Sequence, residues 1–153
     1  NQPASAAVID LGTGKTISYK DFGRMSLLVA AGLRRAGVGS ADTVAIVAKK
    51  GFQQLIGAVA CLRASAAYMP VNSKQMPRER IEQLMELSKA AAIVADDWTL
   101  ETMPWIQDLG LPVLQVQDSL LAEGNATFKA ASKALKGVER AVVRACSYVI
   151  YTS

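Results

Sequence analysis

The apolar positions near the start of the chain follow two different spacings, which predict a hairpin and then a helix. A short apolar run at 6–10 ends in glycines, and the β-branched segment 15–19 resumes in extended character, so we expect a β-hairpin. Ser18 followed three residues later by Asp21 is a partial capping box, and it predicts a helix over 19–36. The apolar residues of this helix recur at helical spacing: Phe22, Met25, Leu28, Val29 and Leu33.

The middle of the chain alternates short apolar runs with longer amphipathic segments. The short runs predict buried strands at 43–48, 67–71, 91–95 and 112–116. The longer segments predict helices at 52–64, at 77–87 with Pro77 as the first helical residue, and at 99–108. Alternation with short loops implies right-handed crossovers. The expected fold class is therefore α/β, with a mainly parallel, doubly wound sheet and helices on both faces.

Segment 119–145 is Ala-rich and gives no single pattern. Its basic residues follow 4-3-4-4 spacing, which would place them on one helical face: Lys129, Lys133, Lys136, Arg140 and Arg144. Because Gly137 weakens a continuous helix, two short helices or a partly ordered linker fit as well as one helix. The basic face indicates either a solvated surface, which we favour, or a surface for an acidic partner. The aromatic and β-branched segment 147–151 predicts a further strand.

Composition limits the classes of protein and of site. The 153 residues suit one domain, and 51% of them are hydrophobic, so a buried core is expected. Net charge is +4 with scattered Lys and Arg and few aromatics, which gives little support for nucleic acid binding. No apolar stretch is long enough to span a membrane, and no residue is histidine, so we expect neither a membrane segment nor a metal site.

Two cysteines, Cys61 and Cys146, each lie inside an apolar run. We expect buried free thiols, which fit a reducing compartment and therefore a cytoplasmic protein. The chain starts without Met and without a targeting segment, so we expect it to be part of a longer protein.

No complete active site is visible in the residues themselves, and no catalytic residue is assigned. Gly12-Thr13-Gly14-Lys15 lacks the spacing of a phosphate loop and is interpreted as a hairpin turn. Asp96 and Asp97 follow a predicted strand, where neighbouring side chains point to opposite faces. We therefore expect helix capping by Asp97, or solvation, instead of a cation site.

Four stretches in order carry a resemblance to a known family. Residues 7–22 are similar to the opening strands and L-T-Y-x-E-L segment of adenylation domains, and 37–46 resembles G-V-x-x-G-D-x-V-A-I. Residues 62–81 are similar to L-K-A-G-x-A-Y-V-P-L-D followed by P-x-E-R-I, and 147–153 resembles A-Y-V-I-Y-T-S. Together they resemble the N-terminal part of a nonribosomal peptide synthetase adenylation domain, in the adenylate-forming, acyl-CoA synthetase superfamily.

The resemblance implies a chemistry and its cofactors. Complete domains of this family use ATP and Mg to convert an acid, usually an amino acid, to an acyl adenylate. The acyl group then passes to the phosphopantetheine thiol of a carrier protein. Only Thr152 and Ser153 match the opening of the ATP phosphate loop, and G-S-T-G-x-P-K-G would follow them. Because the acid pocket and the catalytic Lys would lie beyond residue 153, we expect residues 1–153 alone to be inactive.

The resemblance also implies partners: the remainder of the adenylation domain, and neighbouring condensation and carrier-protein domains. Small MbtH-like helper proteins dock near the segment that Ser65-Ala66-Ala67-Tyr68 resembles. We interpret these four residues as a candidate helper contact, with simple packing of the helix end as the favoured alternative.

Departures from the family pattern leave two further hypotheses. Ala41 and Ser65 stand where the family prefers Gly, and Asn72 where it prefers Asp. The chain could therefore belong to a truncated or decayed noncatalytic domain that serves as a structural or interaction platform. A third hypothesis is an acyl-CoA or fatty-acyl-AMP ligase of the same superfamily.

Overall fold

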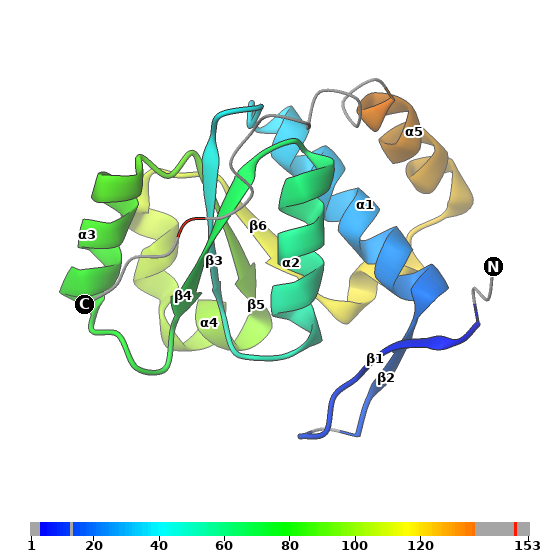
Figure 1. Ribbon diagram of the computed structural model, residues 1–153, viewed down its shortest axis with the longest axis horizontal. Coiled ribbons are helices and arrows are strands. Elements are labelled where there is room, and N and C mark those ends of the chain that lie inside the picture. The colour runs from blue at the N-terminus through cyan, green and yellow to red at the C-terminus, as the bar shows by residue number, and fades with distance from the viewer. Residues whose placement is uncertain (1–3, 13, 137–148, 150–153) are drawn as a thin grey trace.

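The computed structural model describes residues 4–12, 14–136 and 149. In these residues a hairpin precedes alternating helices and strands (Figure 1). The elements are β1 (Ala6–Ile9), β2 (Thr16–Ser18), α1 (Tyr19–Arg35), β3 (Thr43–Ala48), α2 (Phe52–Arg63), β4 (Ala67–Asn72), α3 (Arg78–Ser88), β5 (Ala92–Asp96), α4 (Asp97–Thr102), the 3-10 helix η1 (Pro104–Leu109), β6 (Val113–Val116), the 3-10 helix η2 (Asp118–Ala122) and α5 (Asn125–Leu135).

The described strands β3 to β6 form one parallel sheet in the order β4-β3-β5-β6. The order shows that the chain first adds β4 on one side of β3 and then crosses over to add β5 on the other. This doubly wound topology confirms the fold class predicted from the sequence.

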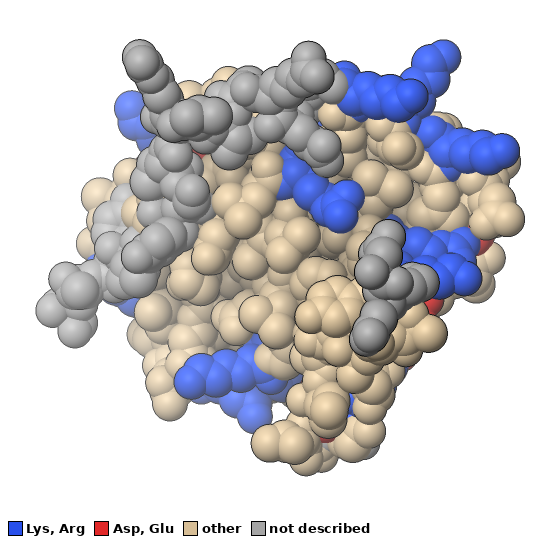
Figure 2. Space-filling model, turned by 45° about the vertical axis from the view of Figure 1, so that its right-hand side comes forward, with Lys and Arg blue, Asp and Glu red and all other residues tan. Residues whose placement is uncertain are grey.

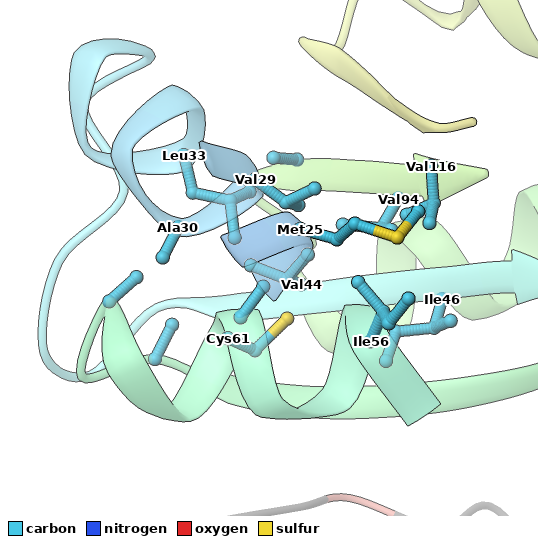
Figure 3. Close-up of a cluster of buried hydrophobic side chains, with 14 of the residues drawn as sticks. Met25, Val29, Ala30, Leu33, Val44, Ile46, Ile56, Cys61, Val94 and Val116 are labelled. Atoms are coloured by element: carbon cyan, nitrogen blue, oxygen red, sulfur yellow. The ribbon is translucent and has the colours of Figure 1, made fainter. Parts of the chain in front are cut away.

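Alternate residues of each central strand enter two separate cores, because successive side chains of a strand point to opposite faces. On β3, Val44 and Ile46 face α1 and α2, whereas Ala45 and Val47 face α3 and η1. Figure 3 shows the first of these cores, where Met25 and Val29 of α1 lie over the sheet. Both faces of β3 are buried, which accounts for its uninterrupted apolar sequence.

The N-terminal elements match the expected hairpin and capped helix. β1 and β2 pair antiparallel, and the turn between them is closed by the Asp10 N–H bonded to the Lys15 carbonyl at 2.8 Å. The Ser18 hydroxyl accepts the Asp21 N–H at 3.1 Å and so caps α1. The N-cap half of the partial capping box predicted from the sequence is therefore confirmed, and the Asp21 carboxylate accepts the Ser18 hydroxyl at 2.8 Å.

The helix predicted over 99–108 is wrong in its bounds and its continuity. The structure has α4 from Asp97 to Thr102, then a break at Met103 and the separate η1. Proline at position 104 has no N–H to donate to an i−4 carbonyl, so a continuous α-helix is interrupted there. The helix predicted from Pro77 begins one residue later, because Pro77 is its N-cap.

In the predicted segment 119–145, the described part contains most of η2 and all of α5. Helix α5 packs on the outer side of α1, where Ala131 contacts the Leu28 and Ala31 cluster (Figure 1). Lys129, Lys133 and Lys136 are exposed. Arg140, Arg144 and Cys146 lie outside the described residues, as does nearly all of the strand predicted at 147–151.

Cys61 and Val149 each lie where the sequence pattern placed them in an apolar run. Cys61 is a fully buried free thiol, and burial raises its pKa to about 12. Val149 donates its backbone N–H to the Tyr68 carbonyl on β4 at 2.9 Å.

No helix in the described part of the chain is both long and apolar enough to cross a membrane.

Candidate functional site

The carboxyl ends of β3 and β5 open into a cleft of about 620 Å³. The topological switch lies between these two strands, since β4 and β5 are added on opposite sides of β3. In open α/β sheets such a crevice is the usual place for a ligand. The cleft is lined by Asp10, Gly12, Lys15, Lys49, Lys50, Phe52, Gln53, Asp96, Asp97, Trp98, Glu101 and Asp118.

Asp96 joins the two strands at the base of this cleft. One of its carboxylate oxygens accepts the Thr99 N–H at 2.8 Å and caps α4, and the other accepts the Lys49 N–H at 3.0 Å. The carboxylate is buried, with 2% of Asp96 exposed. Of the two alternatives expected for Asp97, helix capping is wrong, because Asp96 is the N-cap. Solvation is confirmed, because Asp97 is exposed and accepts the Gln115 amide at 2.6 Å.

Two lysine ammonium groups lie near the indole ring of Trp98 at the carboxyl edge of the sheet. The Lys49 ammonium lies 4.7 Å from the centre of the Trp98 ring, and the Lys74 ammonium lies 6.0 Å from it. A second cavity of about 300 Å³ adjoins the cleft, because Lys49 and Lys50 line both. The remaining residues that line this second cavity are Asn72, Lys74 and Gln75.

The turn between β1 and β2 forms one wall of the cleft through Asp10, Gly12 and Lys15. Lys15 makes an ion pair with Asp118 of η2, and its ammonium lies 4.8 Å from the centre of the Phe52 ring. Asp10 accepts the Gly12 N–H at 2.9 Å. The turn at Gly12 is thus attached to α2 and η2, and it contributes charge to the cleft without forming a phosphate loop.

The candidate helper contact, Ser65-Ala66-Ala67-Tyr68, lies in the turn from α2 into β4. Ser65, Ala66 and Ala67 are buried, and Tyr68 is half-buried. Ser65 has a left-handed backbone with φ of 63°, and Ala41 has φ of 84°. Both positions where the family prefers Gly therefore adopt a conformation that favours Gly.

Thr152 and Ser153 lie outside the described residues, so the contact predicted for them stays a prediction. The sequence analysis missed Lys49, Lys50, Lys74 and Trp98. The available signal was their position shortly after three predicted strands, where an α/β sheet places its ligands. Within the described residues, no group of three or more His, Cys, Asp or Glu side chains could hold a metal ion.

The cleft offers charge and an aromatic surface, but the described residues show no activated nucleophile. Its groups suit the binding of a charged small molecule. On the face shown in Figure 2, Lys and Arg side chains form separate groups, and few acidic side chains are visible. Positive charge on that face is therefore spread over several places.

A family model described as AMP-binding enzyme matches residues 1–153. The chain belongs to this family. Among curated relatives, it is 38% identical over 93 residues to naringenin synthase of Pestalotiopsis fici, which covers 61% of this chain and 3% of the relative. It is 31% identical over 126 residues to tyrocidine synthase 3 of Brevibacillus parabrevis, which covers 82% of this chain and 2% of the relative.

A solved structure of the nonribosomal peptide synthetase FmoA3, in its α-methyl-L-serine-AMP bound form, has the same fold. It matches 99% of this chain and 16% of its own with a TM-score of 0.71 and 24% identity. These similarities confirm the resemblance to the N-terminal part of a peptide-synthetase adenylation domain. The chain spans only 2–3% of the length of the two curated relatives above.

Proposed function

We propose that the chain forms the N-terminal part of an adenylation domain that activates an amino acid within a nonribosomal peptide synthetase. The 126-residue match to tyrocidine synthase 3, at 31% identity, carries this proposal. FmoA3, whose solved form holds an amino acid joined to AMP, supports it through the shared fold.

In the complete domain, ATP would supply the adenylyl group that joins the substrate carboxylate, with release of pyrophosphate, and Mg²⁺ would offset the charge of the phosphates. The described cleft offers Lys49 and Lys50 for contact with phosphate oxygens, and Lys15 there is already paired with Asp118. Five carboxylates also line the cleft, so its lining as a whole is not positive: Asp10, Asp96, Asp97, Glu101 and Asp118. Thr152 and Ser153 would contact the phosphates. The carrier-protein thiol would then accept the acyl group on its phosphopantetheine arm.

Amino-acid-dependent exchange of labelled pyrophosphate into ATP tests this function. We expect exchange by the polypeptide of the complete reading frame, with one amino acid preferred, and none by residues 1–153 alone. Exchange by the isolated chain would contradict the proposed inactivity of the fragment. A folded complete polypeptide without exchange for any acid would favour the noncatalytic platform.

The match to naringenin synthase favours a second candidate, because that relative is named for a product that is not a peptide. In this alternative the activated acid lacks an α-amino group, as in an acyl-CoA or fatty-acyl-AMP ligase. The same exchange assay with phenolic and fatty acids in place of amino acids separates the two candidates.

The proposed domain would have neighbours in the synthetase, namely condensation and carrier-protein domains, and an MbtH-like helper is a further candidate. Because Ala66 and Ala67 are buried, substitutions there would also disturb the fold. Leu62 is 38% exposed, and its carbonyl accepts the Ser65 N–H at 3.0 Å, so Leu62→Glu alters the surface of this turn. We expect Leu62→Glu to abolish co-purification of the helper, whereas the remote Leu87→Glu keeps it.

A further inference from the structure

An apolar cavity of about 330 Å³ lies near the amino ends of β5 and β6. Two of its lining residues, Ala90 and Leu111, each stand two positions before one of these strands. The other lining residues come from α3 and from the end of η1: Glu82, Met85, Glu86 and Leu109. This site, called here the amino-edge cavity, shares no lining residue with the cleft at the carboxyl ends of β3 and β5.

The walls of the amino-edge cavity are mainly apolar. Met85 and Ala90 are buried members of the core on the α3 side of the sheet, and Leu109 and Leu111 are half-buried against the same core. An apolar group placed between these side chains would be removed from water. The volume of the cavity is at the small end of the range for ligand sites, so it suits a small organic molecule.

The charged residues that line the amino-edge cavity are both glutamates. Arg78 donates its Nε to one oxygen of Glu82 at 2.7 Å, and the second oxygen of that carboxylate can accept another donor. Glu86 is exposed and forms no ion pair with a described residue, including the nearby Lys89. The polar side chains of the lining are therefore acceptors only.

The end of α3 adds a second source of negative potential at the amino-edge cavity. The last carbonyl groups of a helix carry a partial negative charge, which favours a cation nearby. The last turn of α3 contains no basic residue, and Glu86 lies in it. The carboxylate and the helix end thus favour the same sign of charge in a ligand.

We propose that the amino-edge cavity binds a small organic cation, an amine whose apolar part fills the cavity and whose ammonium group contacts Glu86. An ammonium group has donors and no acceptor, so it matches the carboxylates of the lining. A carboxylic acid of the same length would bring like charges together and would bind more weakly. The site is distinct from the cleft and does not depend on the proposed amino-acid activation.

Calorimetric titration of the 153-residue chain with hexylamine, hexanol and hexanoate tests the proposal. The three probes have the same number of carbon atoms and differ in the charge of the head group. We expect hexylamine to bind about tenfold more tightly than hexanol, the usual effect of one charge-assisted hydrogen bond, and hexanoate to bind most weakly. Absence of saturable hexylamine binding, or equal affinities for hexylamine and hexanoate, would overturn the proposal.

Isotope-labelled methionine methyl groups give a local readout by NMR, because Met85 lines the cavity. The signal that disappears in Met85→Leu is the Met85 methyl signal. We expect hexylamine to shift this signal and to leave that of Met25, in the other core, unchanged. Saturable binding without a shift of the Met85 signal would place the ligand elsewhere and refute the proposed site.

Glu86→Gln and Glu123→Gln form a matched pair, because each removes one negative charge from an exposed glutamate. We expect Glu86→Gln to weaken hexylamine binding about tenfold and to leave hexanol binding unchanged. Glu123→Gln, at the end of η2, should leave the affinity for hexylamine within about twofold. Equal losses in the two variants would show diffuse attraction and refute a defined site.

Ala90→Val tests the apolar part of the proposal, because it adds two methyl groups to a residue that lines the cavity. We expect it to weaken the binding of hexylamine and of hexanol alike. Unchanged binding of both probes by a folded Ala90→Val chain would contradict the proposed position of the alkyl group. Ala90 is 7% exposed, so thermal unfolding first establishes that this variant is folded, and Glu86→Gln tests the same site at an exposed residue.

Discussion

The two edges of the parallel sheet are built in different ways. At the amino edge, helices α1, α2 and α3 end in the same backbone motif, in which the residue after a left-handed residue donates its N–H to the carbonyl five positions earlier. These bonds run from Val38 to Leu33, from Ala66 to Cys61 and from Ala90 to Met85, at 2.9–3.0 Å. The left-handed residue of each motif is Gly37, Ser65 and Lys89.

At the carboxyl edge, side chains make the connections that backbone bonds make at the other edge. Asp96 ties β5 to the loop after β3, and Lys15 ties the hairpin to η2. Many of the remaining polar groups face solvent in the cleft. The comparison teaches that backbone turns fix the amino edge, whereas the carboxyl edge leaves its side chains available for ligands.

Asp96→Ala should have the largest effect on stability. It removes the cap of α4 and leaves the N–H groups of Lys49 and Thr99 without their partner. We expect a loss of about 3 kcal/mol in the free energy of unfolding, measured by urea denaturation. Asp96→Asn should cost less, because an amide oxygen can still accept one of the two N–H groups.

Asp97→Ala is the matched control for this edge. Its carboxylate is exposed and bonds only the Gln115 amide among the contacts described above. We expect a change within about 0.5–1 kcal/mol. If Asp97→Ala destabilised the chain as much as Asp96→Ala, side-chain bridging by Asp96 would not explain how the carboxyl edge is held.

The buried thiol of Cys61 should make the free energy of unfolding depend on pH. The carbonyl of the same residue closes the amino-edge turn after α2. Burial raises its folded-state pKa from 9.0 to about 12, so above pH 9 the unfolded chain releases a proton that the folded chain keeps. The Cys61 contribution to stability should therefore fall with rising pH, by up to about 1.4 kcal/mol per pH unit. Urea denaturation of the unchanged chain and of Cys61→Ala between about pH 8 and 10 measures the difference between their free energies of unfolding. This difference should become smaller as pH rises.

Glycine substitutions at the amino edge should stabilise the chain. Lys89 holds φ of 49° at the position where Gly37 serves α1 with φ of 90°. Because a left-handed backbone is costly for residues with a Cβ, Lys89→Gly should add about 1 kcal/mol to the free energy of unfolding. Ser65→Gly should add less, since Ser65 takes part in a further interaction.

Two control substitutions test the Lys89→Gly prediction. Gly37→Ala should lose about 1 kcal/mol at the equivalent position of α1. Ala130→Gly, on the exposed side of α5, should also lose about 1 kcal/mol through helix propensity. A decrease in the free energy of unfolding on Lys89→Gly would show that the left-handed backbone of Lys89 does not limit the stability of this turn.

The lysines of the carboxyl edge should have the smallest effect on stability. Lys50 and Lys74 are exposed and form no ion pair with a described residue. Lys50→Gln and Lys74→Gln should therefore change the free energy of unfolding by less than about 0.5 kcal/mol. A larger loss, measured by urea denaturation, would mean that these lysines are structural.

The sequence predicted the elements well wherever one spacing persisted over many residues. The helix at 19–36 and the strand at 43–48 have clear apolar periods, and both lie in the structure close to their predicted bounds. The break at Met103 was missed because it depends on a single proline inside an otherwise helical pattern. The cap was assigned to Asp97 because sequence alone does not fix where β5 ends.

The site was less predictable than the fold, because it depends on strand order. Lys49 and Trp98 are 49 positions apart in the sequence, and they meet only because β3 and β5 are neighbours in the sheet. The family resemblance drew attention to Thr152 and Ser153 instead. Ser65 and Ala41 were recognised as departures from Gly, but their left-handed backbones became visible only in the structure.

Pyrophosphate exchange into ATP is the most direct test of the central claim that this chain is the scaffold of an amino-acid-activating domain. The account predicts amino-acid-dependent exchange by the polypeptide of the complete reading frame and none by residues 1–153. Exchange by residues 1–153 alone, or a folded complete polypeptide that exchanges with no carboxylic acid, would contradict it.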